Sequence, residues 1–128
     1  MKQAIRTDKA PGTESLLSQG IIANDFVFTG GFIHSTVDGK LVEGSVEDKV
    51  TQIMRNLEAV LKEAGLGFDA VVKATIYVTD ISDLPLLNEE YKTYFTQPLP
   101  AREGICVKAL PLGATIEISM VAARLRTK

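Results

Sequence analysis

The chain of 128 residues contains no tryptophan, one cysteine and one histidine, and these scarcities narrow its possible chemistry. A lone cysteine excludes an intrachain disulfide, and Cys106 with His34 supplies neither a zinc ligand set nor an obvious Cys–His dyad. We therefore expect no metal and no cofactor. Cys106 is predicted to be a small packing residue, and His34 an exposed residue at a strand end.

Excess charge and long apolar runs are also missing. The 14 Lys and Arg residues against 16 Asp and Glu residues give a formal net charge of -2, which provides no basic surface for nucleic acid. No apolar stretch approaches the roughly 20 residues of a membrane span, and the first residues do not form a signal peptide. The sequence predicts a soluble, cytoplasmic protein that binds neither a membrane nor nucleic acid.

The remaining pattern indicates one α+β domain over residues 1–128, in the order ββαβαββ. Two helices should cover one face of the sheet, and the other, partly apolar face should need a second subunit. The expected elements are a hairpin over 20–33 with a turn at Asn24 and Asp25, a helix that begins at Ser45 and is stopped by Gly65 or Gly67, a strand over 71–79, a helix from about Ser82 or Asp83 to Phe95, and strands over 102–109 and 114–123.

The last two predicted strands carry an arginine and a glutamate. Side chains alternate along a strand, so Arg102 shares a row with Gly104 and Cys106, and Glu117 shares a row with Val121. We expect these strands to be antiparallel neighbours, with Arg102 and Glu117 on one mixed face. That face is either solvated or covered by another subunit, and its small and apolar residues favour the second interpretation.

Two adjacent glycines end the predicted hairpin. Gly30 and Gly31 either form a simple bulge or allow a ligand to approach the backbone more closely than a Cβ would permit. The sequence leaves both interpretations open.

Three strings together resemble the reactive intermediate deaminase family, whose members are also labelled L-PSP endoribonuclease. They are PAR at 100–102, followed seven residues later by LP and then by IEI at 116–118; NEEYKTYF at 88–95; and KLVEGSVEDK at 40–49. The resemblance implies a chorismate-mutase-like fold, assembled as a homotrimer around a central barrel with sites between subunits. It extends over nearly the whole chain.

The resemblance also implies a reaction. Arg102 would bind the carboxylate of a small imine or enamine acid, such as 2-iminobutanoate or 2-iminopropanoate, and Glu117 would position the water that converts it to a 2-oxo acid and ammonia. These residue types suit the chemistry, because a guanidinium binds a carboxylate in a bidentate manner and a carboxylate can orient or deprotonate water. Catalysis is assigned to Glu117 and Arg102, and substrate binding to Arg102, Gly31, Gly104, Gly30, Leu17 and Asn88.

Some positions depart from the family pattern. The family's tyrosine, serine, cysteine and glutamine correspond here to Leu17, Gly30, Gly104 and Phe32, so the pocket loses hydroxyl and thiol groups and gains apolar character. A non-catalytic carboxylate-binding or regulatory trimer is therefore an alternative function. An endoribonuclease is disfavoured, because the pI is about 5.4 and the single histidine offers no histidine pair.

Overall fold

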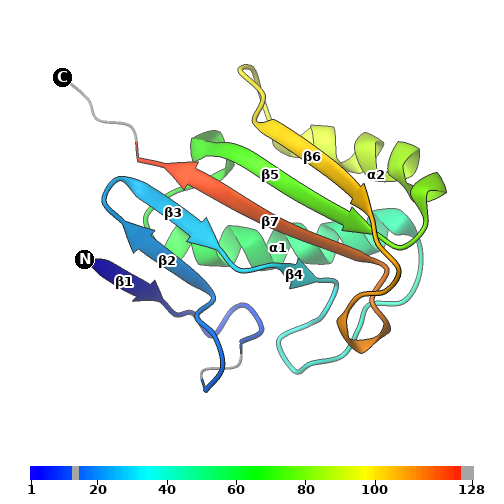
Figure 1. The fold of residues 1–128 in the computed structure, drawn as a ribbon, viewed down its shortest axis with the longest axis horizontal. Coiled ribbons are helices and arrows are strands. Elements are labelled where there is room, and N and C mark those ends of the chain that lie inside the picture. The colour runs from blue at the N-terminus through cyan, green and yellow to red at the C-terminus, as the bar shows by residue number, and fades with distance from the viewer. Residues whose placement is uncertain (13–14, 125–128) are drawn as a thin grey trace.

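A computed structural model describes residues 1–12 and 15–124, and its centre is one mixed sheet with both helices on the same face (Figure 1). The strand order is β1-β2-β3-β7-β5-β6, with β4 pairing with β7; only the β5–β6 pair is parallel. The α+β class is confirmed. The strands are β1 Lys2–Ile5, β2 Gly20–Ala23, β3 Phe26–Thr29, β4 Phe32–Ile33, β5 Val71–Val78, β6 Ala101–Cys106 and β7 Ile116–Ala123, and the helices are α1 Val46–Glu63 and α2 Leu84–Tyr91.

Helix α1 begins and ends where the sequence predicts. The Ser45 hydroxyl accepts a hydrogen bond from the Asp48 amide at 3.0 Å, and acidic residues in the first turn favour the positive end of the helix dipole. Gly65 ends the helical segment with a φ of 78°, a conformation that costs glycine little. The residues that the helix buries against the sheet are Val50, Ile53, Met54, Asn56, Leu57, Val60 and Leu61.

The second helix is shorter than the predicted span of 82–95. Single 3-10 turns, Ile81–Asp83 and Lys92–Tyr94, flank α2 on its two sides. Leu87 and Tyr91 are the residues of α2 that are buried against the core. In β5, Val71 is buried and Val72 and Lys73 are both exposed, because a register irregularity between Val71 and Lys73 interrupts the alternation.

The β2–β3 hairpin is confirmed, with Asn24 at a φ of 55° in its turn. Strand β1 was not predicted. It pairs with β2 at the edge of the sheet, and its first three residues are exposed, so its sequence shows no alternation of apolar and polar side chains.

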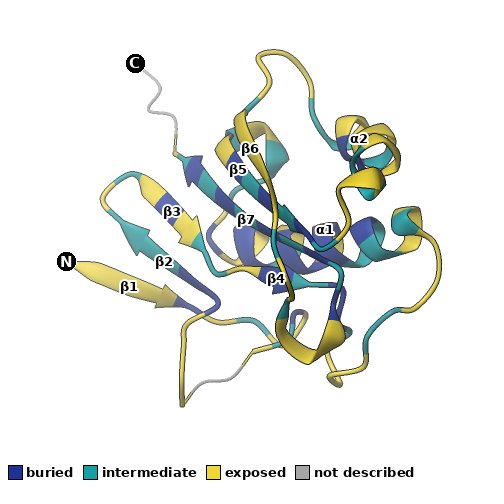
Figure 2. Ribbon diagram, turned by 45° about the vertical axis from the view of Figure 1, so that its right-hand side comes forward, coloured by how far each residue is buried: buried dark blue, intermediate teal, exposed yellow. Residues whose placement is uncertain are grey.

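The prediction that the last two strands are antiparallel neighbours is wrong, because β5 lies between β6 and β7. Helix α2 carries the chain from β5 back to a parallel β6, as a crossover connection requires. Strand β6 is therefore an edge strand, and all six of its residues are exposed (Figure 2).

The core lies between the sheet and the helices, while the outer strands and the opposite sheet face are more exposed (Figure 2). Its largest fully buried side chains include Ile53, Leu57, Ile76 and Ile118. Among the described helices, none combines the length and apolar character needed to cross a membrane.

Candidate functional site

Arg102 lies on the helix-facing side of the edge strand β6. Its register partner in β5 is Ala74, which is fully buried and in turn pairs with Met120. The guanidinium donates a hydrogen bond to the Asn88 Oδ1 atom, and its central carbon lies 4.9 Å from the centre of the Tyr91 ring. Both partners belong to α2, so this helix orients an arginine that is otherwise exposed.

Tyr91 supports the arginine from within the core. Its ring centre lies 4.8 Å from that of Phe95, and its hydroxyl is buried without a hydrogen-bond partner among the described residues. Burial raises the pKa of Tyr91, and the nearby charge of Arg102 acts in the opposite direction. The contact with Arg102 is therefore made by the ring face and not by the hydroxyl.

Glu117 lies on the other face of the sheet. It is half-buried in β7 and pairs with Ile33 of β4 and Tyr77 of β5. A Cβ at position 31 would overlap the Oε2 atom of Glu117, so only glycine leaves room for this carboxylate. Burial raises the pKa of the Glu117 carboxyl, which makes its protonated form more accessible near neutral pH.

The prediction that Arg102 and Glu117 share a face is wrong. Their partners in β5, Ala74 and Tyr77, are three residues apart with regular pairing between them, so the two side chains point to opposite faces. Gly104 also faces the helices, where an added Cβ would lie 3.8 Å from the Leu84 methyl groups. One chain therefore cannot bring Arg102 and Glu117 together over one face of its sheet.

The open face of the sheet, opposite the helices, carries a different set of side chains. Val121 pairs with Phe28, and Ala123 pairs with Phe26, as their predicted place on the Glu117 face requires. Cys106 does not join them, because it lies in the Arg102 row of β6. It is exposed, so its prediction as a packing residue is also wrong within this chain.

A bulge at Gly30 and Gly31 separates β3 from β4. Both strands pair with β7, and the chain between Phe28 and Phe32 holds one residue more than the chain opposite it. The Thr29 hydroxyl accepts a hydrogen bond from the Met120 amide at 2.9 Å and donates one to the Gly30 carbonyl at 2.8 Å. The bulge interpretation is confirmed, and close approach of a ligand stays a prediction.

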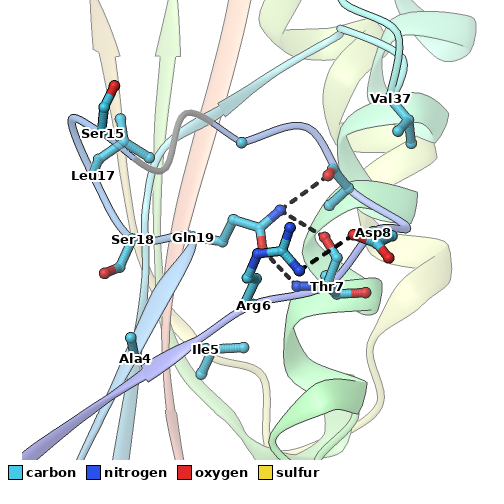
Figure 3. A pocket seen from close by; sticks show the side chains of 12 residues that line it. Ala4, Ile5, Arg6, Thr7, Asp8, Ser15, Leu17, Ser18, Gln19 and Val37 are labelled. Carbon is cyan, nitrogen blue, oxygen red and sulfur yellow. Dashed lines mark hydrogen bonds and ion pairs between the residues drawn. The ribbon is translucent and has the colours of Figure 1, made fainter.

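Gln19 shapes the loop before this site, and the sequence analysis did not single it out. Its buried amide accepts a hydrogen bond from the Thr7 amide at 2.7 Å and donates to the carbonyls of Thr7 and Ala10 (Figure 3). It also donates to the Pro11 carbonyl. Gln19 thus fixes the N-terminal loop over a cavity of about 750 Å³ that Leu17 also lines. No local pattern distinguishes this glutamine from a surface residue.

His34 is fully buried, so its predicted exposure is wrong. Its Nε2 atom accepts a hydrogen bond from the Thr115 amide at 3.0 Å, and its Nδ1 atom lies 2.9 Å from the Val42 carbonyl. These partners fit the neutral tautomer that carries its proton on Nδ1. Burial lowers the pKa of His34, so the ring stays neutral and joins the chain after β4 to the start of β7.

Asn56 is a second buried polar residue that the sequence analysis missed. Its amide donates to the carbonyls of Ile33 and Ser35, at 3.3 Å and 2.9 Å. Asn56 lies three residues after Ile53 and four before Val60, within the apolar stripe of α1. A polar residue in such a stripe is the one signal that could have identified it.

A second cavity, of about 460 Å³, adjoins the bulge. Gly30, Gly31 and Phe32 form one wall, and Leu17, Val37 and Leu112 lie on other sides. Leu17, Gly30 and Gly31, all predicted site residues, are thus brought together, whereas Arg102, Asn88 and Gly104 cluster near α2. Within residues 1–12 and 15–124, no group of three or more His, Cys, Asp or Glu residues could hold a metal ion.

The chain is similar in sequence and in structure to several known proteins. The family model described as endoribonuclease L-PSP matches residues 7–124. The chain is 42% identical to the chloroplastic Reactive Intermediate Deaminase A of Arabidopsis thaliana, over 94% of this chain and 65% of that longer protein. It is 39% identical to the 2-iminobutanoate/2-iminopropanoate deaminase of Rattus norvegicus, over 97% and 91% of the two chains. The crystal structure of yeast Mmf1 superposes with a TM-score of 0.94 at 30% identity, covering 98% of this chain and 100% of that one.

Proposed function

Because the chain belongs to the reactive intermediate deaminase family, whose model is described as endoribonuclease L-PSP, we propose that it hydrolyses 2-imino acids to 2-oxo acids and ammonia. The proposed substrates are small acids such as 2-iminobutanoate and 2-iminopropanoate. The observation that carries the proposal is the half-buried Glu117 carboxylate, held directly over the backbone of Gly31. A carboxyl whose pKa is raised by burial is suited to general acid–base work near neutral pH.

In the proposed site, Arg102 of one subunit meets Glu117 of another. This arrangement follows from their positions on opposite faces of the sheet in a single chain. The open face carries large exposed apolar side chains, including Phe26, Phe28 and Ile105, which a second copy would remove from water. We propose a homotrimer whose open faces line a central barrel, as the family resemblance implies; a closed ring of identical contacts would leave no such face exposed.

Hydrolysis then proceeds with Glu117 as the proton carrier. The carboxylate accepts a proton from water as the water oxygen bonds to C2, and the C=N electron pair moves to nitrogen. In the protonated imine the nitrogen already carries two hydrogens, so the proton held by Glu117 converts it to an ammonium leaving group; the C–N bond breaks with release of ammonia, and the remaining hydroxyl proton is lost to solvent as C2 becomes a carbonyl. The net reaction consumes one water and releases one ammonia for each 2-oxo acid.

Arg102 binds the substrate carboxylate in this scheme. Asn88 and Tyr91 already orient its guanidinium, which lowers the conformational entropy lost on binding. The exposed backbone of Gly104, two residues further along β6, supplies room for the substrate beside the arginine. Asn88 therefore serves as a positioning residue for Arg102 in addition to its predicted place near the substrate.

The test compares imine hydrolysis by the wild-type chain, Glu117→Gln and Glu58→Gln. Glu58 is an exposed glutamate of α1 and provides the matched control. We expect Glu117→Gln to slow hydrolysis of 2-iminobutanoate by roughly 100-fold, with binding of 2-oxobutanoate retained and Glu58→Gln unaffected. Hydrolysis by Glu117→Gln at the wild-type rate would remove this residue from the mechanism.

A non-catalytic carboxylate-binding trimer is the second candidate function. Its supporting observation is that Leu17, Gly30 and Gly104 provide neither hydroxyl nor thiol groups around the proposed site. Binding of 2-oxobutanoate without any acceleration of imine hydrolysis would favour it. The ribonuclease label receives less support, since the ring nitrogens of the only histidine are both engaged within the chain and the net charge is -2.

A further inference from the structure

The cavity beside Gly31 is bordered by apolar side chains that are unusually exposed. Leu17, Val37 and Leu112 expose 53%, 55% and 76% of their surface, respectively, and all three line this single cavity of about 460 Å³. They come from segments far apart in the sequence: the N-terminal loop, the chain after β4, and the connection between β6 and β7. Exposed apolar residues that converge from separate segments mark a binding surface.

Leu112 is held at the cavity by an unfavourable backbone conformation. Its φ is 59° and its ψ is 17°, in the left-handed region that leucine rarely adopts and that glycine or asparagine adopts more readily. A strained residue with an exposed apolar side chain favours a role for that side chain in contact with a ligand or partner.

The cavity adjoins the residue against which the Glu117 carboxylate lies. Its wall includes Gly30 and Gly31, and Gly31 is the residue against which the Glu117 carboxylate lies. Phe32 and Ile33 extend the same wall with apolar side chains. A substrate side chain that passes Gly31 can therefore reach a largely apolar space, much larger than a methyl group requires, whose lining also includes the polar residues Ser18, Ser35 and Asp38.

We propose that this cavity receives the side chain of the substrate, and that the chain prefers 2-imino acids with bulky apolar side chains over 2-iminopropanoate. The inference rests on the proposed deaminase function and specifies its substrate class. A leucine-derived 2-imino acid is the representative case, since its branched side chain can contact Leu17, Val37 and Leu112 together.

The experiment compares kcat/KM for 2-imino-4-methylpentanoate and for 2-iminopropanoate, each generated from its amino acid by an amino acid oxidase and corrected for hydrolysis without the protein. We expect kcat/KM to be at least about 10-fold higher for the larger imine, because each methylene in an apolar pocket is worth about 10-fold or more. Equal values for both imines would overturn the inference and leave the deaminase function intact.

Two cavity variants and one control connect the preference to the cavity. Leu112→Asn suits the left-handed backbone, and Leu17→Ser shortens the opposite wall; each should reduce the preference for the larger imine by about 10-fold. Leu16→Ser is the matched control, because Leu16 is 80% exposed and lies outside the lining of this cavity. A preference unchanged in both cavity variants, or reduced equally by the control, would contradict the inference.

Two further measurements separate the possible failures. Calorimetric binding of 4-methyl-2-oxopentanoate and 2-oxopropanoate tests the cavity without any catalysis, so tighter binding of the larger acid would support the inference even if neither imine were hydrolysed. Light scattering of the variants tests whether a second copy of the chain, and not a substrate side chain, occupies the cavity. Dissociation of Leu112→Asn or Leu17→Ser with an unchanged preference would show that a second copy of the chain covers the cavity, and would overturn the inference.

Discussion

Arg102 and Glu117 are separated by a single strand, yet their surroundings differ in almost every respect. Arg102 is exposed on an edge strand and is oriented by two residues of one short helix. Glu117 is half-buried next to a backbone bulge whose neighbouring loops are fixed by Gln19, His34 and Asn56. Contacts with one nearby helix orient Arg102, whereas contacts between segments far apart in the sequence position Glu117. Within a single chain the two side chains do not meet.

Mixed assemblies provide the strongest test of this division. Arg102→Ala and Glu117→Gln should each be nearly inactive alone, whereas subunits mixed in equal amounts and reassembled should recover about one quarter of the wild-type sites, because each site needs one intact residue from each of two subunits. The measurement is imine hydrolysis before and after reassembly. If the mixture stayed inactive although subunit exchange had been demonstrated, both residues of a site would have to come from one subunit.

Substitution of Asn88 or Tyr91, which contact the Arg102 guanidinium, should weaken substrate binding. Asn88→Ala and Tyr91→Leu should each raise KM by about 10-fold with a smaller change in kcat, since a hydrogen bond to a charged group contributes about 1.5–3 kcal/mol and a cation–π contact about 0.5–2 kcal/mol. Tyr91→Phe keeps the ring face and removes only a hydroxyl without a partner among the described residues, so its KM should stay close to the wild-type value. Equal losses in the Phe and Leu variants would indicate that the ring does not position Arg102.

The buried histidine should make folding sensitive to mild acid. Burial lowers the folded-state pKa of His34 below 6.5, so its contribution to stability is present above pH 6.5 and is lost as the pH falls through the folded-state pKa. His34→Gln should be less stable than the wild type by about 1–3 kcal/mol at pH 7 and should show a smaller loss on acidification. Denaturant titrations between pH 7 and pH 5 measure both effects, and parallel pH profiles would rule out the assignment.

The smallest expected effect concerns Glu117. A raised folded-state pKa means that its stabilising contribution is complete below the usual value of 4.5 and is lost as the pH rises through the folded-state pKa. Glu117→Gln should therefore raise Tm slightly at pH 7, and this gain should disappear near pH 4. A variant that is less stable at pH 7 would show that the ionised carboxylate has a stabilising partner in the assembled protein.

Local signals predicted the elements that depend on neighbouring residues. The capping serine at position 45 and the apolar stripe of α1 located that helix closely, and Asn24 located the hairpin turn. Strand β1 gave no such signal, because an exposed edge strand buries too little to impose alternation on its sequence.

The order of strands and the buried polar groups could not be predicted in the same way. Alternation fixes which residues of one strand share a face, but it does not state which strand lies beside it, so Arg102 and Glu117 were placed together incorrectly. The burial of His34 depends on Thr115, 81 residues further along the chain, and a single sequence carries no record of that contact. The functional roles of Arg102 and Glu117 stay predictions.

The extra residue at Gly30 and Gly31 also reverses the phase of the chain. In β3 the even-numbered Phe28 points to the open face, whereas in β4 the even-numbered Phe32 points to the core, so the alternation changes sign between them. Removing one residue from this segment would eliminate the bulge; Phe32 would then follow Phe28 by three positions and would stay opposite Ile118, turned toward the core. Segment length therefore decides whether the bulge forms, whereas the identity of residue 31 decides how closely the Glu117 carboxylate can lie against the backbone.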